Sequence, residues 1–296
     1  MVSHDAYLAA YAQLSTLTDV ERLARDPACG LSFEALLCIL AQKQLALTKR
    51  TDGQHRASAH RYVERWLRGE TLCDVATAVG VPPTKMARFV LEEHLGEKKG
   101  RGVGQLLKNP HAIADERLRR DVAAAVEADT QYGPHVDTAK RLSGLEYEEL
   151  LGQKLRALEV PFLTEEQLRV RGEAKTPDVL LPVPLLVRGR VVNWIDSKAT
   201  FGDPATHAEY RTQFSAYLNR FDTGLVIYWF GFDESIDADV RIQLLDDLRA
   251  DECELMACMP QPCPDGAYGL TDERLTLSPL GATLPGTLPL EGGDAA

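Results

Sequence analysis

Two acidic side chains and one amine stand at a spacing that suits the hydrolysis of a phosphate ester. Asp178 opens one short apolar run, and the triplet DSK at residues 196–198 ends another, 18 residues later. Because alternate residues of a strand point to the same side, Asp196 and Lys198 are expected to emerge together. If Asp178 begins the neighbouring strand, its carboxylate meets that of Asp196.

Such a pair of carboxylates can hold Mg²⁺, a hard cation that prefers oxygen ligands and keeps several waters, with Mn²⁺ as the alternative. The ion would lower the pKa of a bound water and offset charge that builds on the phosphoryl group. Lys198 would orient or deprotonate this water, or stabilise the negative charge, and the sequence leaves all three roles open. The competing interpretation is a surface Asp/Lys pair, since Asp-x-Lys occurs by chance in many proteins.

A third acid is predicted on the preceding helix. Glu148, Leu151 and Leu155 recur at i, i+3 and i+7 and therefore share one helical face, which would place Glu148 beside the core and near the metal. We predict Glu148 as a catalytic and metal-binding residue together with Asp178 and Asp196. Glu146 is the rival, and an exposed helical glutamate is the alternative for both.

Two polar residues follow on the next helix. Gln213 and Tyr217 are four apart and thus neighbours on its surface, where they could contact the nucleic-acid backbone or brace the lysine. His207 and Tyr210, one turn earlier, are weaker candidates for a direct role. The alternative is plain aromatic packing by Tyr210, Phe214, Tyr217 and Phe221.

The elements that must position these residues form an α/β domain over residues 129–259. Branched apolar runs at 179–181, 185–187 and 191–195 predict strands, and Arg188-Gly189 predicts a turn between the last two. A helix should begin after them, with Asp203 as N-cap and Pro204 at its first position. The apolar run at 224–232 then predicts a strand that is covered on both faces.

Residues 1–128 predict an all-α region that contains a helix-turn-helix. Apolar spacing over Thr71–Glu93 gives two helices, and Gly80 suits the sharp turn between them. Thr84, Lys85 and Arg88 would then project from the second helix towards DNA. The alternative is a structural helical bundle. A weaker helical pair, at residues 20–25 and 32–47, is a candidate second unit.

Charge is unevenly distributed along the chain. The net charge is -11, yet residues 1–128 hold 18 Lys and Arg against 16 Asp and Glu. Six basic residues gather within 49–68, which is either a solvated helix face or a source of phosphate contacts. The segment EKKGRGVG at 97–104 predicts a hinge or a phosphate-facing loop. Residues 260–296 predict a flexible, acidic tail rich in Pro and Gly.

Composition excludes other classes of protein. No stretch approaches the ~20 apolar residues of a membrane span, and the first residues lack a secretory signal. Six cysteines fall singly, which suits a reducing compartment: cytoplasmic in a prokaryote or archaeon, nuclear or cytoplasmic in a eukaryote. Cys253, Cys258 and Cys263 are either part of a metal site with unusual spacing or unpaired thiols.

From about Tyr132 to Asp233 the sequence resembles the TPD-domain proteins, the codanin-interacting nuclease family. The matching segments are YGP (132–134), the glutamate-containing helix (144–151), FLTEEQLR (162–169), KTPD (175–178), WIDSKATFGD (194–203), QFSAYLNRF (213–221) and GLVIYWFGF (224–232). The resemblance implies a restriction-endonuclease-like fold and a Mg²⁺-dependent nuclease of the PD-(D/E)xK class, with the active-site acids and lysine at Asp178, Asp196 and Lys198. Members of the family carry Glu where Asp196 stands, and the class accepts either acid.

We therefore predict a restriction-endonuclease-like α/β domain behind a helix-turn-helix region, acting as a metal-dependent nuclease on DNA, with structure-specific cleavage as one form of that activity and with endonuclease and exonuclease action both open. RNA as substrate and a homodimer stay open, no membrane partner is expected, and the sequence identifies no protein partner. The first alternative is a catalytically silent protein that binds DNA or recruits partners. The second is a transcription regulator that reads a fixed operator.

Overall fold

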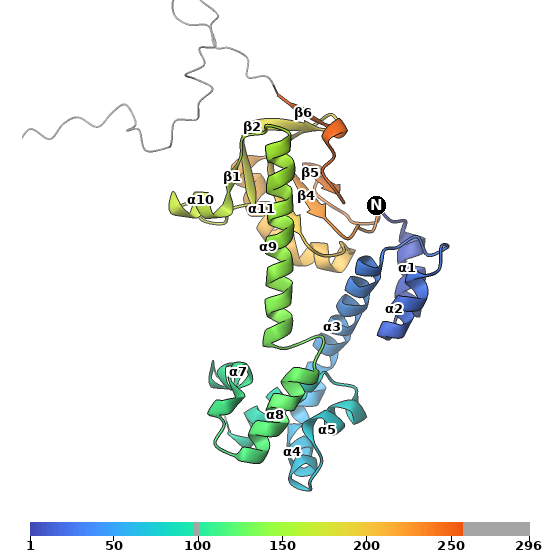
Figure 1. Cartoon of the computed structure of the whole chain (residues 1–296), viewed down its shortest axis with the longest axis vertical. Coiled ribbons are helices and arrows are strands. Elements are labelled where there is room, and N and C mark those ends of the chain that lie inside the picture. The colour runs from blue at the N-terminus through green and yellow to red at the C-terminus, as the bar shows by residue number, and fades with distance from the viewer. Residues whose placement is uncertain (97–100, 257–296) are drawn as a thin grey trace, which may run out of the picture. The chain divides into compact units, whose positions relative to one another are not determined.

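A mixed sheet of six strands lies in the second half of the described chain (Figure 1). In the computed structural model, residues 1–96 and 101–256 are described. The strands follow the order β1-β2-β3-β4-β5, with β6 paired to β2 as well. They are β1 (Leu163–Thr164), β2 (Val179–Val187), β3 (Arg190–Lys198), β4 (Gly224–Tyr228), β5 (Ile242–Leu245) and β6 (Cys253–Leu255). Strands β2 and β3 are antiparallel, whereas β3, β4 and β5 run parallel.

The β2–β3 hairpin has the turn that its sequence predicts. Arg188 and Gly189 have φ values of 49° and 73°, the two positive angles that a tight two-residue hairpin turn requires. Strand β4 is buried along its whole length, as the apolar run from Gly224 predicts. The predicted α/β arrangement of this half is therefore confirmed.

Helices cover both faces of the sheet. Helix α9 (Pro134–Ala157) packs Leu151 and Leu155 into one hydrophobic cluster with Ile195 of β3. Helix α11 (Pro204–Phe221) packs its aromatic residues into another cluster with Trp194. Because consecutive residues of a strand face opposite sides, α9 and α11 lie on opposite faces. Asp203 caps α11 through the Thr206 amide at 2.6 Å, so the predicted helix start is confirmed.

The first half of the chain is helical, as predicted. Its helices are α1 (His4–Gln13), α2 (Leu17–Ala24), α3 (Phe33–Ala57), α4 (Ala59–Leu67), α5 (Leu72–Val79), α6 (Pro83–His94), α7 (Arg101–Lys108) and α8 (Glu116–Ala128), with a 3₁₀ turn η1 (Pro110–Ala112). Two shorter elements follow the long helices: α10 (Glu165–Val170) and the 3₁₀ turn η2 (Ala250–Glu252). Helices α4 to α8 share one hydrophobic core.

The predicted helix-turn-helix pair is present as α5, Gly80 and α6, but its surroundings do not suit a recognition helix. Gly80 caps α5 in the left-handed region, with φ 69°. Helix α6 contacts α4, α5, α7 and α8, and six of its residues are buried. Thr84 is one of them: its amide donates to Asp129 and its hydroxyl to the carbonyl of Tyr132. The prediction that Thr84 projects towards DNA is corrected, because the bundle encloses it.

The first helices pack against the sheet rather than forming a separate region. Phe201, which follows β3, joins the hydrophobic cluster of α1, α2 and α3, and its ring stacks on Tyr7 with centroids 5.8 Å apart. Gln42 donates to the carbonyl of Phe201 at 2.7 Å, and Val2 pairs with Asp233 as an isolated bridge. One hydrophobic cluster therefore includes residues from both sides of the predicted boundary between 128 and 129, whereas the core of α4 to α8 lies wholly before it.

Some predictions fall wholly or partly outside the described residues. In the segment 97–104, residues 101–104 belong to α7 instead of a loop, and 97–100 are not described. The tail at 260–296, with Cys263, is likewise outside the described residues, and so is Cys258. Cys253 is a free cysteine. Among the described helices, none combines the length and the apolar character that crossing a bilayer demands.

The close approach of β4 to β3 allows no side chain at position 224. A Cβ atom on Gly224 would lie 2.0 Å from Cε2 of Trp194. We expect Gly224→Ala to lower the free energy of unfolding by about 3 kcal/mol or more, because Trp194 is fully buried and cannot move aside. Urea unfolding of the variant measures this.

Gly144→Ala is the matched control, since Gly144 lies within α9 and a Cβ there meets nothing within 4 Å. We expect it to stabilise the chain by about 0.5–1 kcal/mol through helix propensity. Equal unfolding midpoints for the two variants would contradict the packing of Trp194 over position 224.

Candidate active site

The β2–β3 register brings Asp178 and Asp196 together. Val179 pairs with Ile195 in the antiparallel ladder, so one further step places Asp178 opposite Asp196. The backbone amide of Ser197 donates to Oδ2 of Asp178 at 2.7 Å. Two carboxylates that are 18 residues apart in sequence therefore belong to one site.

Lys198 completes the centre. Its Nζ lies 2.5 Å from Oδ2 of Asp196, and the side chain is 13% exposed beside a carboxylate that is fully buried. Tyr210 of α11 covers the ammonium, with its ring centroid 4.5 Å from Nζ. Burial alone would lower the pKa of Lys198, but Asp196 and then Asp178 outweigh it and the pKa is raised. In this arrangement Lys198 is a cation.

Burial makes both acids of the centre harder to ionise than an exposed aspartate. Burial, followed by the charge of Asp196, raises the pKa of Asp178 well above its usual value. Burial also raises the pKa of Asp196, although Lys198 opposes that shift. Oδ1 of Asp196 is buried and has no hydrogen-bond partner among the described residues. Two buried carboxylates thus share one ammonium, which leaves a position that favours a second cation.

Glu148 lies on α9 at the edge of this centre. Burial raises the pKa of its carboxyl group, with further contributions from the negative charges of Glu165 and Asp196. Glu148 is an exposed residue of α9, the alternative that the sequence left open, and its carboxyl group lies within electrostatic reach of Asp196. Glu146, the rival, is likewise exposed on α9, and its charge acts on Tyr147.

Glu165 is a neighbour that the sequence reasoning missed. Its amide donates to the carbonyl of Asp178 at 3.1 Å, and its Oε1 accepts from the Thr176 hydroxyl at 3.3 Å. Its charge contributes to the raised pKa of Asp196 and of Glu148. The available signal was the capping box of Thr164 and Gln167, which starts α10 at Glu165.

The donor set of Asp178 and Asp196 fits Mg²⁺. Within residues 1–96 and 101–256, no three His, Cys, Asp or Glu side chains converge as a preformed metal cluster. Glu148 therefore stays a predicted third ligand, near the two acids but not clustered with them. Mg²⁺ commonly binds one or two carboxylates and keeps waters in its other positions, so Asp178 and Asp196 fit the ion.

Tyr217 and Gln213 support the turn before Asp178. The Tyr217 hydroxyl donates to the carbonyl of Thr176 at 2.9 Å and accepts from Nε2 of Gln213 at 2.6 Å. The side chain of Tyr217 is 2% exposed, which raises the pKa of its hydroxyl through burial. The prediction that Tyr217 contacts nucleic acid is corrected, because its hydroxyl is used inside the protein. Gln213 is partly exposed.

The other residues predicted for the site lie in different surroundings. His207 is buried with Nδ1 3.0 Å from the hydroxyl of Tyr228, so its contact is internal to α11 and β4. Lys85 and Arg88 lie on α6 and pair with Asp52 and Glu92, respectively. Trp229, which the sequence reasoning passed over, donates to the Ser197 hydroxyl at 2.8 Å and fixes β3 between the two catalytic candidates.

The fold and the site define an α/β protein whose helix-flanked mixed sheet carries a buried centre of two acids and one lysine. A family model described as "Protein of unknown function TPD sequence-motif" matches residues 114–248, which include all three residues. The chain belongs to the CDAN1-interacting nuclease 1 family, as the resemblance predicted.

The relatives that show this family are similar over most of the chain. The CDAN1-interacting nuclease 1 of Xenopus tropicalis is 38% identical over 262 residues, 83% of this chain and 86% of the relative. The human protein of that name is 38% identical, with 77% and 84% covered, and the Danio rerio protein is 39% identical, with 70% and 74% covered. The comparison with solved structures gave no match.

Removing one of the two buried acids should stabilise the metal-free protein. Because the folded pKa of Asp178 is raised, stability is lost as the pH rises from the ordinary aspartate value through the raised one, and neutral pH lies on the unfavourable side. We expect Asp178→Asn to raise the melting temperature by about 2–4 °C in EDTA. Its amide oxygen can still accept from the Ser197 amide.

Mg²⁺ at millimolar concentration should raise the melting temperature of the wild type and leave that of Asp178→Asn unchanged, because binding to the folded state stabilises it. Asp237→Asn, at an exposed aspartate, serves as the control. An equal Mg²⁺ shift in the wild type and in Asp178→Asn would contradict the two-carboxylate site.

Tyr217→Phe should destabilise the chain by about 1–2 kcal/mol, since it leaves the buried carbonyl of Thr176 without its donor. The matched control is Tyr11→Phe, whose hydroxyl has no hydrogen bond among the described residues. Urea unfolding checks both variants. A loss no larger than that of the control would show that the hydroxyl does not support the turn before Asp178.

Proposed function

We propose that the chain is a metal-dependent endonuclease of the PD-(D/E)xK class, with a restriction-endonuclease-like fold, and that it hydrolyses phosphodiester bonds in DNA. The observation that carries the proposal is the buried pair Asp178 and Asp196 with Lys198 as its only close ammonium among the described residues. The relatives are named nucleases, which supports the same activity for this chain.

The arrangement of elements supports the fold proposal. A long helix precedes a hairpin that carries both acids, and a second helix leads into a parallel, buried strand. Asp196 and Lys198 lie at the end of β3, on the face that carries Trp194 and that α11 covers, and Asp178 lies opposite Asp196 just before β2. The helix-turn-helix pair of α5 and α6 is part of the bundle of α4 to α8.

Asp178 and Asp196 would hold the metal ion, which when bound supplies an activated water and offsets negative charge on the phosphoryl group. Lys198, kept charged by Asp196, would stabilise the same developing charge. Tyr210 excludes water from one side of the ammonium and thereby strengthens its field. Glu148 and Glu165 border the centre, where either can accept a proton from a water that enters.

A cavity of about 600 Å³ beside the centre offers a path for the substrate. It is bordered by Glu165 and Thr176 on one side and by Gln213 on the other. Its wall carries the cations Arg169 and Lys175 and the acids Glu165, Glu173 and Glu209, and Arg169 is paired with Glu165. Lys175 is thus the cation of this wall that we propose for a backbone phosphate. Gln213 is thereby kept as a proposed nucleic-acid contact, whereas Tyr217 acts through its support of the wall.

A second proposed function is the recruitment of a protein partner. The relatives are named for an interaction with CDAN1, and we extend a protein interaction of this kind to this chain. A chain that only recruits partners, with a silent centre, is the alternative to the nuclease.

Lys198→Ala should reduce Mg²⁺-dependent cleavage by about 100-fold or more, because a charge that stabilises the transition state is lost from a buried site. Cleavage of duplex, single-stranded, flapped and four-way DNA, and of RNA, measures the effect and identifies the substrate. Lys140→Ala, at an exposed lysine of α9, is the control and should cleave as the wild type does.

Two outcomes would contradict the nuclease proposal. One is a wild type that cleaves none of these substrates with either Mg²⁺ or Mn²⁺. The other is a folded Lys198→Ala protein that cleaves at the wild-type rate, which would assign any activity to a different site.

A further inference from the structure

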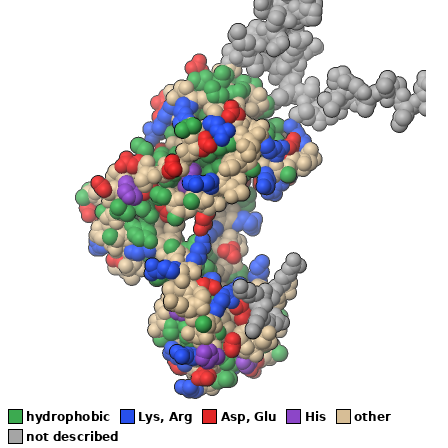
Figure 2. Space-filling view, turned by 180° about the vertical axis from the view of Figure 1, so that it is seen from behind, with side chains coloured by type: hydrophobic (Ala, Val, Ile, Leu, Met, Phe, Trp, Pro, Cys, Tyr) green, Lys and Arg blue, Asp and Glu red, His purple; other side chains and the backbone are tan. Residues whose placement is uncertain are grey.

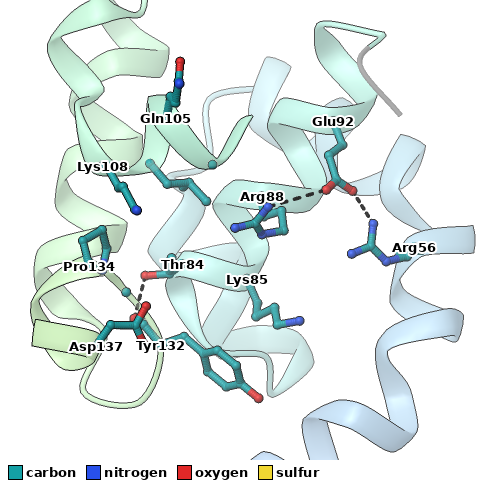
Figure 3. A pocket seen from close by; sticks show the side chains of 13 residues that line it. Arg56, Thr84, Lys85, Arg88, Glu92, Gln105, Lys108, Tyr132, Pro134 and Asp137 are labelled. Atoms are coloured by element: carbon teal, nitrogen blue, oxygen red, sulfur yellow. Dashed lines mark hydrogen bonds and ion pairs between the residues drawn. The ribbon is translucent and has the colours of Figure 1, made fainter. Parts of the chain in front are cut away.

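A second cavity, of about 680 Å³, lies among the helices and contains none of the residues of the active centre. The end of α3, one side of α6, the end of α7 and the start of α9 form its wall (Figure 3). Its volume is within the range of ligand-binding sites in proteins. Nothing in the proposed nuclease chemistry uses it.

The wall of this cavity is rich in cations. Arg56, Lys85, Arg88 and Lys108 contribute four positive charges, against the carboxylates of Glu92 and Asp137. The first three come from partly exposed side chains, between 21% and 34% exposed. Solvent therefore screens these three charges less than charges on an open surface, whereas Lys108 is exposed.

The face of the molecule drawn in Figure 2 does not show the same enrichment, because its Lys and Arg side chains are interspersed with Asp and Glu. For a chain of net charge -11, a cavity with four basic residues is a local exception.

Two of the four cations are compensated from within the protein. Asp52 lies 2.7 Å from Nε of Arg56 and 3.0 Å from Nζ of Lys85. Glu92 is also paired with Arg56. These contacts orient both side chains and satisfy much of their charge.

Arg88 and Lys108 are less compensated. Nη1 of Arg88 is 3.9 Å from Glu92, and its guanidinium makes no hydrogen bond to another described residue. Lys108 has no ion pair within the described part of the chain and points towards the same space as Arg88 (Figure 3). A guanidinium and an ammonium with unused donors are suited to a phosphate group.

The start of α9 adds to this field. Gly133 occupies its N-cap position without a side-chain hydrogen bond, and Pro134 follows at the first helical position. The first amides of a 24-residue helix therefore stay without a capping acceptor at the cavity wall. Asp137 in the first turn of α9 offsets part of this potential, and Arg88 and Lys108 add to it in the same cavity.

A self-contained ion-pair network would explain Arg56 and Lys85 but leaves Arg88 and Lys108 without a function. We infer that this cavity binds a backbone phosphate of a nucleic-acid strand, as an anchor separate from the active centre. This inference rests on the proposed action on nucleic acid.

Helix α9 connects the cavity with the active centre, since Pro134 lines the cavity and Glu148 borders the centre. Fourteen residues of helix span about 21 Å, or about six phosphate steps of one strand.

The test measures binding of a fluorescent 20-nucleotide DNA by anisotropy, in EDTA so that no cleavage occurs. We expect the double variant Arg88→Gln/Lys108→Gln to bind about tenfold more weakly than the wild type. The slope of log affinity against log salt should fall by about 0.7 for each lost phosphate contact. Arg25→Gln, at a side chain 80% exposed on α2, is the control and should bind as the wild type does.

Glu92→Gln should instead increase the affinity for the DNA. It removes the acid that competes for Arg88 and Arg56, so a severalfold tighter complex is expected. Tighter binding cannot be the result of partial unfolding, which would weaken the complex. Thermal unfolding of each variant checks that it is folded.

Wild-type affinity and salt slope in the double variant would overturn the inference. So would a double variant that loses binding of inorganic phosphate or ATP but keeps that of DNA, because the cavity would then serve a small ligand. The proposed nuclease activity is judged separately by cleavage with Mg²⁺. If the double variant binds DNA more weakly but the wild type cleaves nothing, the nuclease proposal fails and the inference stands. If the wild type cleaves but the double variant binds DNA as the wild type does, the inference fails and the nuclease proposal stands.

Discussion

Burial of two carboxylates against one ammonium is the constraint on which the site depends. Asp178 and Asp196 face each other across β2 and β3, and the repulsion between them in a poorly solvated place works against folding. The fold keeps them there by strong local contacts: the sheet ladder, the Ser197 amide on Asp178 and the ammonium of Lys198 on Asp196. The two buried acids lower the stability of the folded chain, but they also favour binding of a cation between them. This combination is expected of a functional site.

The rest of the α/β half makes this arrangement rigid. Trp194 precedes Asp196 by two residues on the same face, and the missing side chain of Gly224 lets its ring lie flat against β4. Tyr217 reaches across from α11 to hold the carbonyl of Thr176, two residues before Asp178. Each acid is thus fixed by a buried aromatic residue nearby in sequence or in space. Small displacements of the acids would disturb a shared ion, so a tightly packed support is physically required.

Sequence patterns predicted the features that depend on local spacing. The period of two in β3 placed Asp196 and Lys198 on one face, and Arg188-Gly189 and Gly80 marked their turns. Features that depend on distant neighbours were missed. Nothing near Thr84 in the sequence reveals that Asp129 and Tyr132 will cover it. Similarly, Phe201 packs with the first helices, and Glu165 lies next to Asp178, only because of tertiary packing.

Electrostatics explains why binding and chemistry should be separated in this chain. In the proposed nuclease, two carboxylates of the centre face one ammonium, and the whole chain carries -11. Both repel a polyanion when the acids are ionised, so we expect affinity for nucleic acid to come from cations placed elsewhere. Arg88, which is 34% exposed, and the exposed Lys108 are such cations in the cavity at the start of α9. A single continuous helix leads from that cavity to Glu148. A nucleic-acid strand that is bound at the cavity therefore has a fixed distance to span before it reaches the centre.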